Sequence, residues 1–438
     1  MKQVMHKRLI TGLYFGNIIG ISLYWWLTFG THTNPTTSNI LIAISHWAGL
    51  VTVIVVLTEL LMMARVRFIE NAYSLDELTR IHRWNGYAVV VLLLIHALFV
   101  TVGYQLVSSN SFIGQLVAFS LSYEDVLNAI IGAILFLIVA GSSVKIARAA
   151  VSYEVWYFIH LLAYFAIVLT FGHQVHSGPD FIAHPGFAAY WYVLYGLVAA
   201  IIAYARFLRP IINSLRLDLR IANIAHETHD TYTMTLDTQR PDLFDYQAGQ
   251  FAIWYVLTKK LWWQGHPFSM SSKPGEPLRF SVKIEGNYTT DLQAAAIGSR
   301  VWVDGPHGRF VYNRATSKKL LMIAGGVGVT PIYSLLKEIP ADYHVVLLYA
   351  CRSSDDVLFR DAIDDLARDK NITVNYYYSQ QPGASAQYID KAVLGEVQDL
   401  AAHDVFLCGP PAMMDSITDL LVNLGVPKKH IYSERFDY

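Results

Sequence analysis

The stretch IHRWNGYAVVVLLLIHALFV, Ile81–Val100, decides the fold of the first half of the chain. It is almost wholly apolar after Tyr87, yet it holds two histidines, His82 and His96. About 20 apolar residues of helix cross a bilayer core, and a polar side chain inside such a span marks a functional site by default. Fourteen residues of helix rise about 21 Å and return to within about 40° of the same face. We therefore expect both imidazoles to point the same way, one near each leaflet.

The rest of the sequence places this stretch among six apolar spans. Hydrophobic residues make up 54% of the 438 residues and charged residues only 15%, which is too apolar for an ordinary soluble protein. The expected spans are Leu9–Phe29, Ile40–Ala64, His82–Leu106, Val126–Val144, Val155–Phe171 and Ala188–Phe207. The two cysteines, Cys351 and Cys408, lie outside the spans, which argues against a disulfide framework.

Lysine and arginine are distributed unevenly among the loops. They precede the first span, lie between the second and third and between the fourth and fifth, and follow the sixth. The other three loops, Gly30–Asn39, Val107–Asp125 and Gly172–Phe187, contain neither residue. The positive-inside rule then predicts a multi-pass protein of the cell membrane with its N- and C-termini in the cytoplasm.

The fifth span repeats the pattern with His160 and His173. The third and fifth spans run in the same direction, so His82 should lie level with His160, and His96 level with His173. Imidazole nitrogens ligate haem iron axially, so two such pairs predict two haems stacked across the membrane. A helix–helix hydrogen bond is the alternative role for a membrane histidine. Thirteen residues turn about 140° away from one face, so we expect a π-bulge or a bend in this span.

Paired histidines spaced fourteen and thirteen residues apart in the third and fifth of six spans resemble the ferric reductase and NADPH oxidase superfamily. RIHRWNGY, with Gly86 one turn after His82, is similar to its bacterial members. The resemblance implies two b-type haems and favours His173 over His176 as the outer ligand. The implied iron ligands are His82, His96, His160 and His173. His46 lies about where eukaryotic relatives carry an arginine near the outer haem. It either handles oxygen or a propionate or makes an ordinary polar contact.

From about Asn213 the sequence pattern changes. Short runs such as LRLDLRIANI, YTMTLDT and RFSVKIEG predict an antiparallel β-barrel. After Lys318, apolar strands such as KLLMIAG and HVVLLYA alternate with helical stretches, which predicts an α/β unit with a parallel sheet. We expect a multi-domain chain, with an all-α transmembrane bundle over 1–212, the barrel over 213–314 and the α/β domain over 315–438.

Four motifs make this half resemble the ferredoxin–NADP reductase family. The first two, HPFSMSS and KIEGNYTTDL, imply that the barrel binds FAD. In the family, the aromatic at Phe268 packs on the isoalloxazine, the hydroxyl at Ser269 reaches its N5, and the turn from Gly286 meets the pyrophosphate, at a helix start where anions are favoured. The implied flavin residues are His266, Pro267, Phe268, Ser269, Lys283, Gly286, Tyr288, Thr289 and Thr290.

The other two motifs, IAGGVGVTPI and CGPPAMM, imply a nicotinamide dinucleotide site in the α/β domain. Glycines let the backbone approach the pyrophosphate, and proline suits a first helical turn. The implied residues are Gly325, Gly326, Gly328, Thr330, Pro331, Cys408, Gly409 and Pro410. The resemblance places Cys408 near the hydride path, and in the final SERFDY it implies an aromatic that covers the flavin. Phe436 fits that pattern, Tyr438 is the alternative, and simple packing is the other reading. Ser269, Cys408 and Phe436 are thus the candidate catalytic residues.

Arg352, after the strand HVVLLYA, bears on the choice of nucleotide. Arginine pairs with phosphate bidentately, so Arg352 is a candidate partner for a 2′-phosphate. The stretch SQQP, Ser379–Pro382, lacks a basic residue that soluble relatives carry there, and Asp355 and Asp356 lie close by. We expect NADPH to be preferred, with NADH also accepted.

The combined resemblance implies that electrons pass from NADPH to FAD, then through the inner and outer haems to an acceptor outside. We expect O2, which would give superoxide, because the outer loops offer no lysine or arginine to hold an anionic iron chelate. Ferric-chelate reduction stays open as an alternative. So does delivery to a bound partner protein. No nucleic-acid partner is expected.

Overall fold

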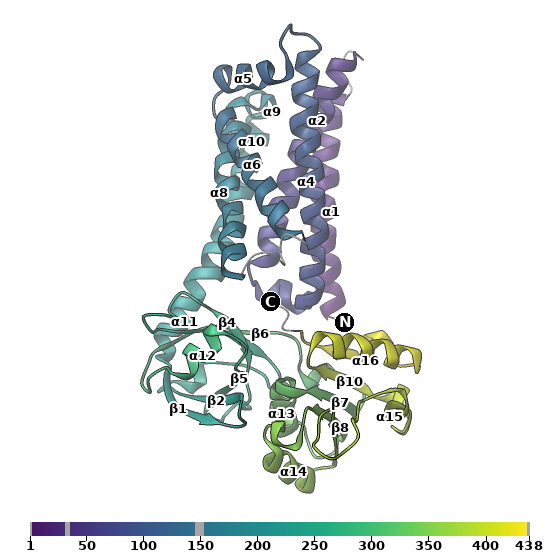
Figure 1. Cartoon of the computed structure of the whole chain (residues 1–438). Coiled ribbons are helices and arrows are strands. Elements are labelled where there is room, and N and C mark those ends of the chain that lie inside the picture. Colours follow the sequence, from purple (N-terminus) through teal and green to yellow (C-terminus); the bar gives the residue numbers. More distant parts are fainter. Residues whose placement is uncertain (1, 31–35, 145–152, 436–438) are drawn as a thin grey trace. The chain divides into compact units, whose positions relative to one another are not determined.

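The computed structural model describes residues 2–30, 36–144 and 153–435, so Phe436 and Tyr438 lie outside the described residues. The chain forms two compact units: the first ends at Ala205 and the second begins at Arg206. Figure 1 shows the first as long helices running alongside one another, and the second as strands with shorter helices.

The helices of the first unit agree with the expected spans. Among the described residues, six helices are long and apolar enough to cross a membrane. The long helices are α1 (Lys2–Trp25), α2 (Thr37–Met63), α4 (Leu75–Gln105), α6 (Val126–Ser143), α8 (Tyr153–Ser177) and α10 (Pro185–Ile202). Shorter helices lie between them: α3 (Arg67–Ala72), α5 (Phe112–Ser122) and α9 (Pro179–Ala183). The multi-pass prediction is confirmed.

Two of the spans end irregularly. α1 continues as a π-helix over Trp26–Gly30, and α10 as a π-helix over Ala203–Leu208. The second π-helix is followed by α11 (Arg209–Leu217), which belongs to the second unit. The core of the first unit includes Trp191 of α10, fully buried beside Ile21 and Leu50.

The second unit begins with two small antiparallel sheets, in the orders β1-β2-β5 and β4-β3-β6. Their strands are β1 (Arg220–His226), β2 (Thr231–Asp237), β3 (Phe251–Val256), β4 (His266–Ser269), β5 (Leu278–Lys283) and β6 (Val301–His307), with α12 (Asn287–Gln293) between the last two. An isolated bridge between Met270 and Phe280 joins the two sheets. α11 packs on β6, where the Ser214 hydroxyl accepts a hydrogen bond from Val303 N at 2.9 Å. The expected antiparallel barrel is confirmed.

The rest of the second unit is a five-stranded parallel sheet in the order β11-β10-β7-β8-β9. The elements are β7 (Lys319–Gly325), α13 (Val329–Glu338), β8 (His344–Cys351), α14 (Arg360–Asp369), β9 (Ile372–Tyr378), α15 (Lys391–Gly395), β10 (Asp404–Cys408), α16 (Pro411–Asn423) and β11 (Ile431–Ser433). β7 shows how the sheet is covered. Its Leu320 and Met322 pack with α13 and α14, whereas Leu321 and Ile323 pack with α15 and α16. Helices therefore cover both faces of the sheet, as the α/β prediction requires.

The order of the sheet creates a switch point. From β7 the chain proceeds through β8 and β9 on one side, and through β10 and β11 on the other. In open α/β sheets ligands bind at the carboxyl ends of the strands where the order reverses. The loops that follow β7 and β10 are therefore the expected place for a nucleotide.

Candidate functional site

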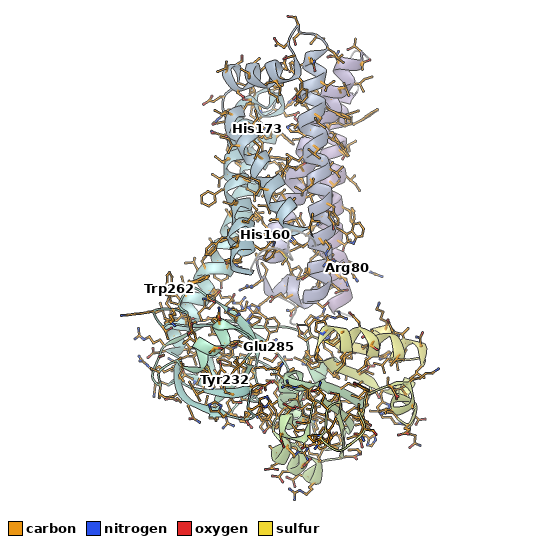
Figure 2. The ribbon with its side chains drawn as sticks, viewed as in Figure 1. Arg80, His160, His173, Tyr232, Trp262 and Glu285 are labelled. Atoms are coloured by element: carbon orange, nitrogen blue, oxygen red, sulfur yellow. The ribbon has the colours of Figure 1, made fainter. Side chains whose placement is uncertain are left out.

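Four histidines form two pairs between α4 and α8. The ring centroids of His82 and His160 (the first pair) lie 5.9 Å apart, and those of His96 and His173 (the second pair) 6.3 Å apart. Figure 2 shows His160 and His173 at two levels of the bundle. An iron midway between two axial imidazoles, with metal–nitrogen bonds of about 2 Å, would separate the ring centroids by roughly 6 Å. Both pairs therefore have the spacing of axial ligands.

In both histidines of α4, the Nδ1 atom contacts an acceptor on α2. His82 Nδ1 makes a short contact with Glu59 Oε2, and His96 Nδ1 lies 2.9 Å from Ser45 O. When Nδ1–H donates to such an acceptor, the Nε2 lone pair is left for a metal. Gly49 permits the second contact, because a Cβ there would lie 2.8 Å from His96 Nδ1.

The histidines of α8 are less satisfied. Nδ1 of His160 and of His173 is buried with no hydrogen-bond partner among the described residues. A buried polar atom without a partner costs of order 1–3 kcal/mol and calls for an explanation, such as a group that the site is built to hold. Beside the first pair, a Cβ at Gly86 would meet no atom within 4 Å, so the backbone there is open to an adjoining ring. These residues fit two bis-histidine haems.

His176 does not join the second pair. Its Nδ1 lies 2.8 Å from Asp125 Oδ2 at the start of α6. α8 is α-helical over its whole length, so of the π-bulge or bend expected in the fifth span, the π-bulge is absent. An ideal helix turns His160 and His173 about 140° apart, yet both reach α4.

His46 of α2 follows directly after Ser45, whose carbonyl faces His96. Its ring packs edge-on against Phe29 with centroids 4.9 Å apart, and its Nδ1 is buried with no partner among the described residues. His46 is thus adjacent in sequence to the residue that contacts His96, and its Nδ1 has no hydrogen-bond partner among the described residues. Its role stays a prediction.

In the barrel, stacked rings and orphaned hydroxyls gather on β4 and α12. Ser269 is 6% exposed, and neither its Oγ nor the buried hydroxyl of Tyr288 has a hydrogen-bond partner among the described residues. The rings of Tyr288 and His266 stack at 3.6 Å between centroids, and Phe268 lies nearly parallel to Phe280 at 5.5 Å. Burial raises the pKa of the Tyr288 hydroxyl, so it stays protonated as a donor. Flat rings beside unpaired hydroxyls suit a planar polar ligand such as a flavin.

The turn expected to meet the FAD pyrophosphate leads into α12. Backbone N–H groups of Glu285 and Gly286 donate to Thr289 Oγ1 at 3.0 and 3.1 Å, and Thr290 Oγ1 donates to Gly286 O at 3.0 Å. Lys283 Nζ is engaged by Glu285 at 2.6 Å. The two threonine hydroxyls therefore shape the turn in this structure, and their contact with FAD stays a prediction.

In the α/β domain, the loops after β7 and β10 touch through glycines. A Cβ at Gly328 would lie 2.5 Å from Cys408 O, and one at Gly325 would lie 2.7 Å from Met413 Sδ. Gly326 differs, because its φ of 52° favours glycine and a Cβ there would meet no atom within 4 Å. Gly325 and Gly328 thus serve loop packing, while Gly326 leaves open backbone at the switch point.

The remaining nucleotide-site candidates lie close by. Cys408 is 1% exposed and its Sγ donates to Glu434 O at 3.6 Å, and burial raises the pKa of this thiol well above its usual value. Thr330 Oγ1 donates to Val327 O at 2.7 Å, and Pro331 lies in the first turn of α13, as expected. Gly409 and Pro410 belong to the loop that packs on Gly325. Phe436 lies outside the described residues.

Arg352, the candidate for a 2′-phosphate, is already paired with carboxylates. Its Nη2 lies 2.7 Å from Asp230 Oδ2 and 3.2 Å from Asp356 Oδ1. A 2′-phosphate would have to compete with both carboxylates for the guanidinium. The role of Arg352 in the choice of nucleotide stays a prediction.

Several residues of the site were not singled out from the sequence. They are Glu59, Ser45, Gly49, Tyr232, which donates to Thr289 O at 2.8 Å, and Tyr349, which donates to Gly326 O at 3.2 Å. Glu59 carried a signal, because an acidic residue within a span marks a functional site by default. The others depend on contacts between distant segments and had no sequence signal.

Comparison with known families agrees with this geometry. Residues 48–171 match the model of the ferric reductase like transmembrane component, residues 217–321 that of an FAD-binding domain, and residues 322–419 that of the oxidoreductase NAD-binding domain. The chain has the architecture of the ferric reductase and NADPH oxidase superfamily. The chain thus combines matches to a ferric reductase-like membrane domain with matches to FAD- and NAD-binding domains.

Individual proteins resemble parts of this ferric reductase-like chain. NADH-cytochrome b5 reductase 1 of Cryptococcus neoformans is 31% identical over 171 residues, which are 35% of this chain and 58% of that protein. The flavohemoprotein of Oceanobacillus iheyensis is 30% identical over 39% of this chain and 46% of its own length. The chain thus spans about half the length of these relatives. Among solved structures, the ferredoxin reductase in carbazole 1,9a-dioxygenase is similar over 50% of this chain and 69% of its own, at 24% identity and a TM-score of 0.45.

Proposed function

We propose that the chain is a transmembrane oxidoreductase that takes a hydride from NADPH in the cytoplasm and delivers single electrons to an acceptor on the outer side. The observation that carries the proposal is the presence of two histidine pairs with axial spacing, at two levels of one membrane bundle, in a chain that also holds FAD- and NAD-binding domains. When bound, FAD and two b-type haems would supply the conversion of an electron pair into single electrons and a path for them across the lipid.

The protein's residues hold and orient these groups. The two histidine pairs would ligate the irons, and the engaged Nδ1 atoms of His82 and His96 fix which ring nitrogen is free. Ser269, whose hydroxyl has no other partner among the described residues, would hydrogen-bond the flavin. The Cys408 thiol, kept protonated by burial, would pack near the nicotinamide and would not act as a base. The loops after β7 and β10 would receive the pyrophosphate at Gly326.

The acceptor that we favour is O2, with superoxide as the product. The three loops that would face outward contain no lysine or arginine, whereas Glu124 and Asp125 add negative charge there. Ferric chelates are commonly anionic, so this surface would repel them, while it is indifferent to neutral O2. The orientation with both termini in the cytoplasm rests on the same distribution of basic residues.

The purified protein tests the proposal directly. Its spectrum should show bis-histidine b-type haem at about two per chain, and anaerobic NADPH should reduce both haems when FAD is present. On admission of air, superoxide should form faster than ferric citrate is reduced under matched conditions. A protein that holds FAD but binds no haem would refute the proposal. Faster ferric-citrate reduction would identify a metal reductase, and reduction of neither acceptor would favour delivery to a bound partner protein.

A further inference from the structure

Glu59 is an acidic residue in the otherwise apolar second half of α2. It is the only carboxylate in the sequence of α2, Thr37–Met63, and it is 8% exposed. An ionised group inside a membrane span is costly, so such residues face the interior of a bundle, pair with other groups and mark function. Its neighbours show what this carboxylate serves.

Both oxygens of Glu59 are used, and both by α4. Oε2 makes the short contact with His82 Nδ1, and Oε1 accepts a hydrogen bond from Asn85 Nδ2 at 2.7 Å. Tyr14 of α1 in turn donates to Asn85 Oδ1 at 3.5 Å. The carboxylate is therefore held in one orientation while it accepts from the imidazole of the first pair.

The second pair is built differently. His96 Nδ1 faces the backbone carbonyl of Ser45, at 2.9 Å, which is neutral. On α8, Nδ1 of His160 and of His173 has no partner among the described residues. The two histidines of α4 therefore differ in their acceptors: His82 faces a carboxylate and His96 a neutral carbonyl. Asp125, the carboxylate beside Gly172 near the second pair, is instead hydrogen-bonded to His176, which is not a ligand in this assignment.

We propose that Glu59 is a positioning residue that makes the two haem sites unequal. By accepting a hydrogen bond from His82 Nδ1–H it fixes the tautomer and ring orientation, and it raises the basicity of the ligand. A more basic ligand and a nearby negative charge stabilise oxidised iron over reduced iron. The first site therefore has a lower reduction potential than the second, so the equilibrium between the sites favours an electron at the second pair. This inference rests on the proposed function.

The test is a redox titration of the haem-loaded protein. His96→Ala should lose the haem of the second pair, so the potential that disappears in this variant identifies the second haem. In the wild type the first haem should have the lower potential. Glu59→Gln keeps the shape but removes the charge, and it should favour reduction of the first haem about tenfold, which is about 59 mV for one electron. The second haem should not shift. Thr58→Val is the matched control, since the Thr58 hydroxyl bonds to Ile54 O of its own helix, and both potentials should stay as in the wild type.

The outcomes separate this inference from the proposed function. If the wild-type protein does not bind two haems, the proposed function itself is refuted. Two haems together with an unshifted first potential in Glu59→Gln would overturn the role of Glu59 and leave the function standing. If Glu59→Gln instead loses one haem, Glu59→Asp, which keeps the charge, should restore it. Equal loss of both haems in both variants would overturn the inference, because a positioning residue acts on one site.

Discussion

His173 and His176 lie three residues apart on α8, but their neighbours differ. His173 faces His96, whereas His176 is hydrogen-bonded to Asp125. We predict that His173→Ala costs one haem, because the iron is left with one axial ligand, while His176→Ala keeps both. Haem content and the NADPH-reduced spectrum, taken anaerobically, measure this. One haem in His176→Ala beside two in His173→Ala would reverse the assignment of the outer ligand.

Arg352 allows a second prediction at the residue scale. Removing its guanidinium should lower kcat/KM for NADPH more than for NADH, since only NADPH carries the 2′-phosphate. We expect a loss of about tenfold or less, because Asp230 and Asp356 already occupy the guanidinium. Asp230→Asn should do the opposite and favour NADPH, because it frees part of Arg352. Steady-state kinetics with both nucleotides measure these changes. An equal loss of kcat/KM for NADPH and NADH in Arg352→Ala would show that Arg352 does not select between the two nucleotides.

Much of the membrane site could be predicted residue by residue, because histidines are rare in apolar spans and their spacing carries the geometry. The residues that contact these histidines were harder to predict from the sequence. Ser45 contributes a backbone carbonyl, which any residue would provide, and Gly49 matters only because α4 comes close to α2. In the reductase half, the motifs marked the loops but did not reveal that Thr289 and Thr290 are used within their own turn.

At the scale of elements, the contact between the loops after β7 and β10 is sensitive to a single methyl group. In Gly328→Ala the new Cβ would meet Cys408 O at 2.5 Å, and the backbone on both sides cannot yield easily. We predict a destabilisation of about 1–3 kcal/mol and weaker binding of the nucleotide. Gly395→Ala, where a Cβ meets no atom within 4 Å, is the control. Thermal unfolding and nucleotide titration of both variants test this, and equal melting temperatures would contradict it.

Secondary structure followed the sequence where periodicity and length were decisive, as in the six spans and in the parallel strands. It departed from expectation in α8, which contains no π-bulge, and at the ends of α1 and α10, where π-helices occur. A π-helical turn replaces i→i+4 backbone hydrogen bonds with i→i+5 bonds, and this does not change the hydropathy of the sequence. Such irregularities therefore depend on packing that a single sequence does not display.

At the scale of the whole molecule, the point of division between membrane bundle and reductase can be tested. The sequence favours a boundary at Asn213, but α11 begins at Arg209, whose Nη2 donates to Gly305 O at 3.3 Å. We predict that fragments starting at Arg206 and at Asn213 both bind FAD and reduce a dye with NADPH, without haem bands. The longer fragment should be more stable by about 1 kcal/mol, since a hydrogen bond within a protein contributes about that much. Urea unfolding compares them, and failure of both to accept hydride would refute the flavin assignment.

The difference between the acceptors behind the two histidine pairs has a consequence for how this protein can evolve. The partner of His82 is a side chain, so one base change in the Glu59 codon can replace it with glutamine. The partner of His96 is a main-chain oxygen, which no substitution at Ser45 removes. Lineages that adopt new acceptors can thus adjust one site through a single codon, while the other stays constant unless a helix moves. Natural variation should accordingly collect at position 59 and spare the contact at position 45.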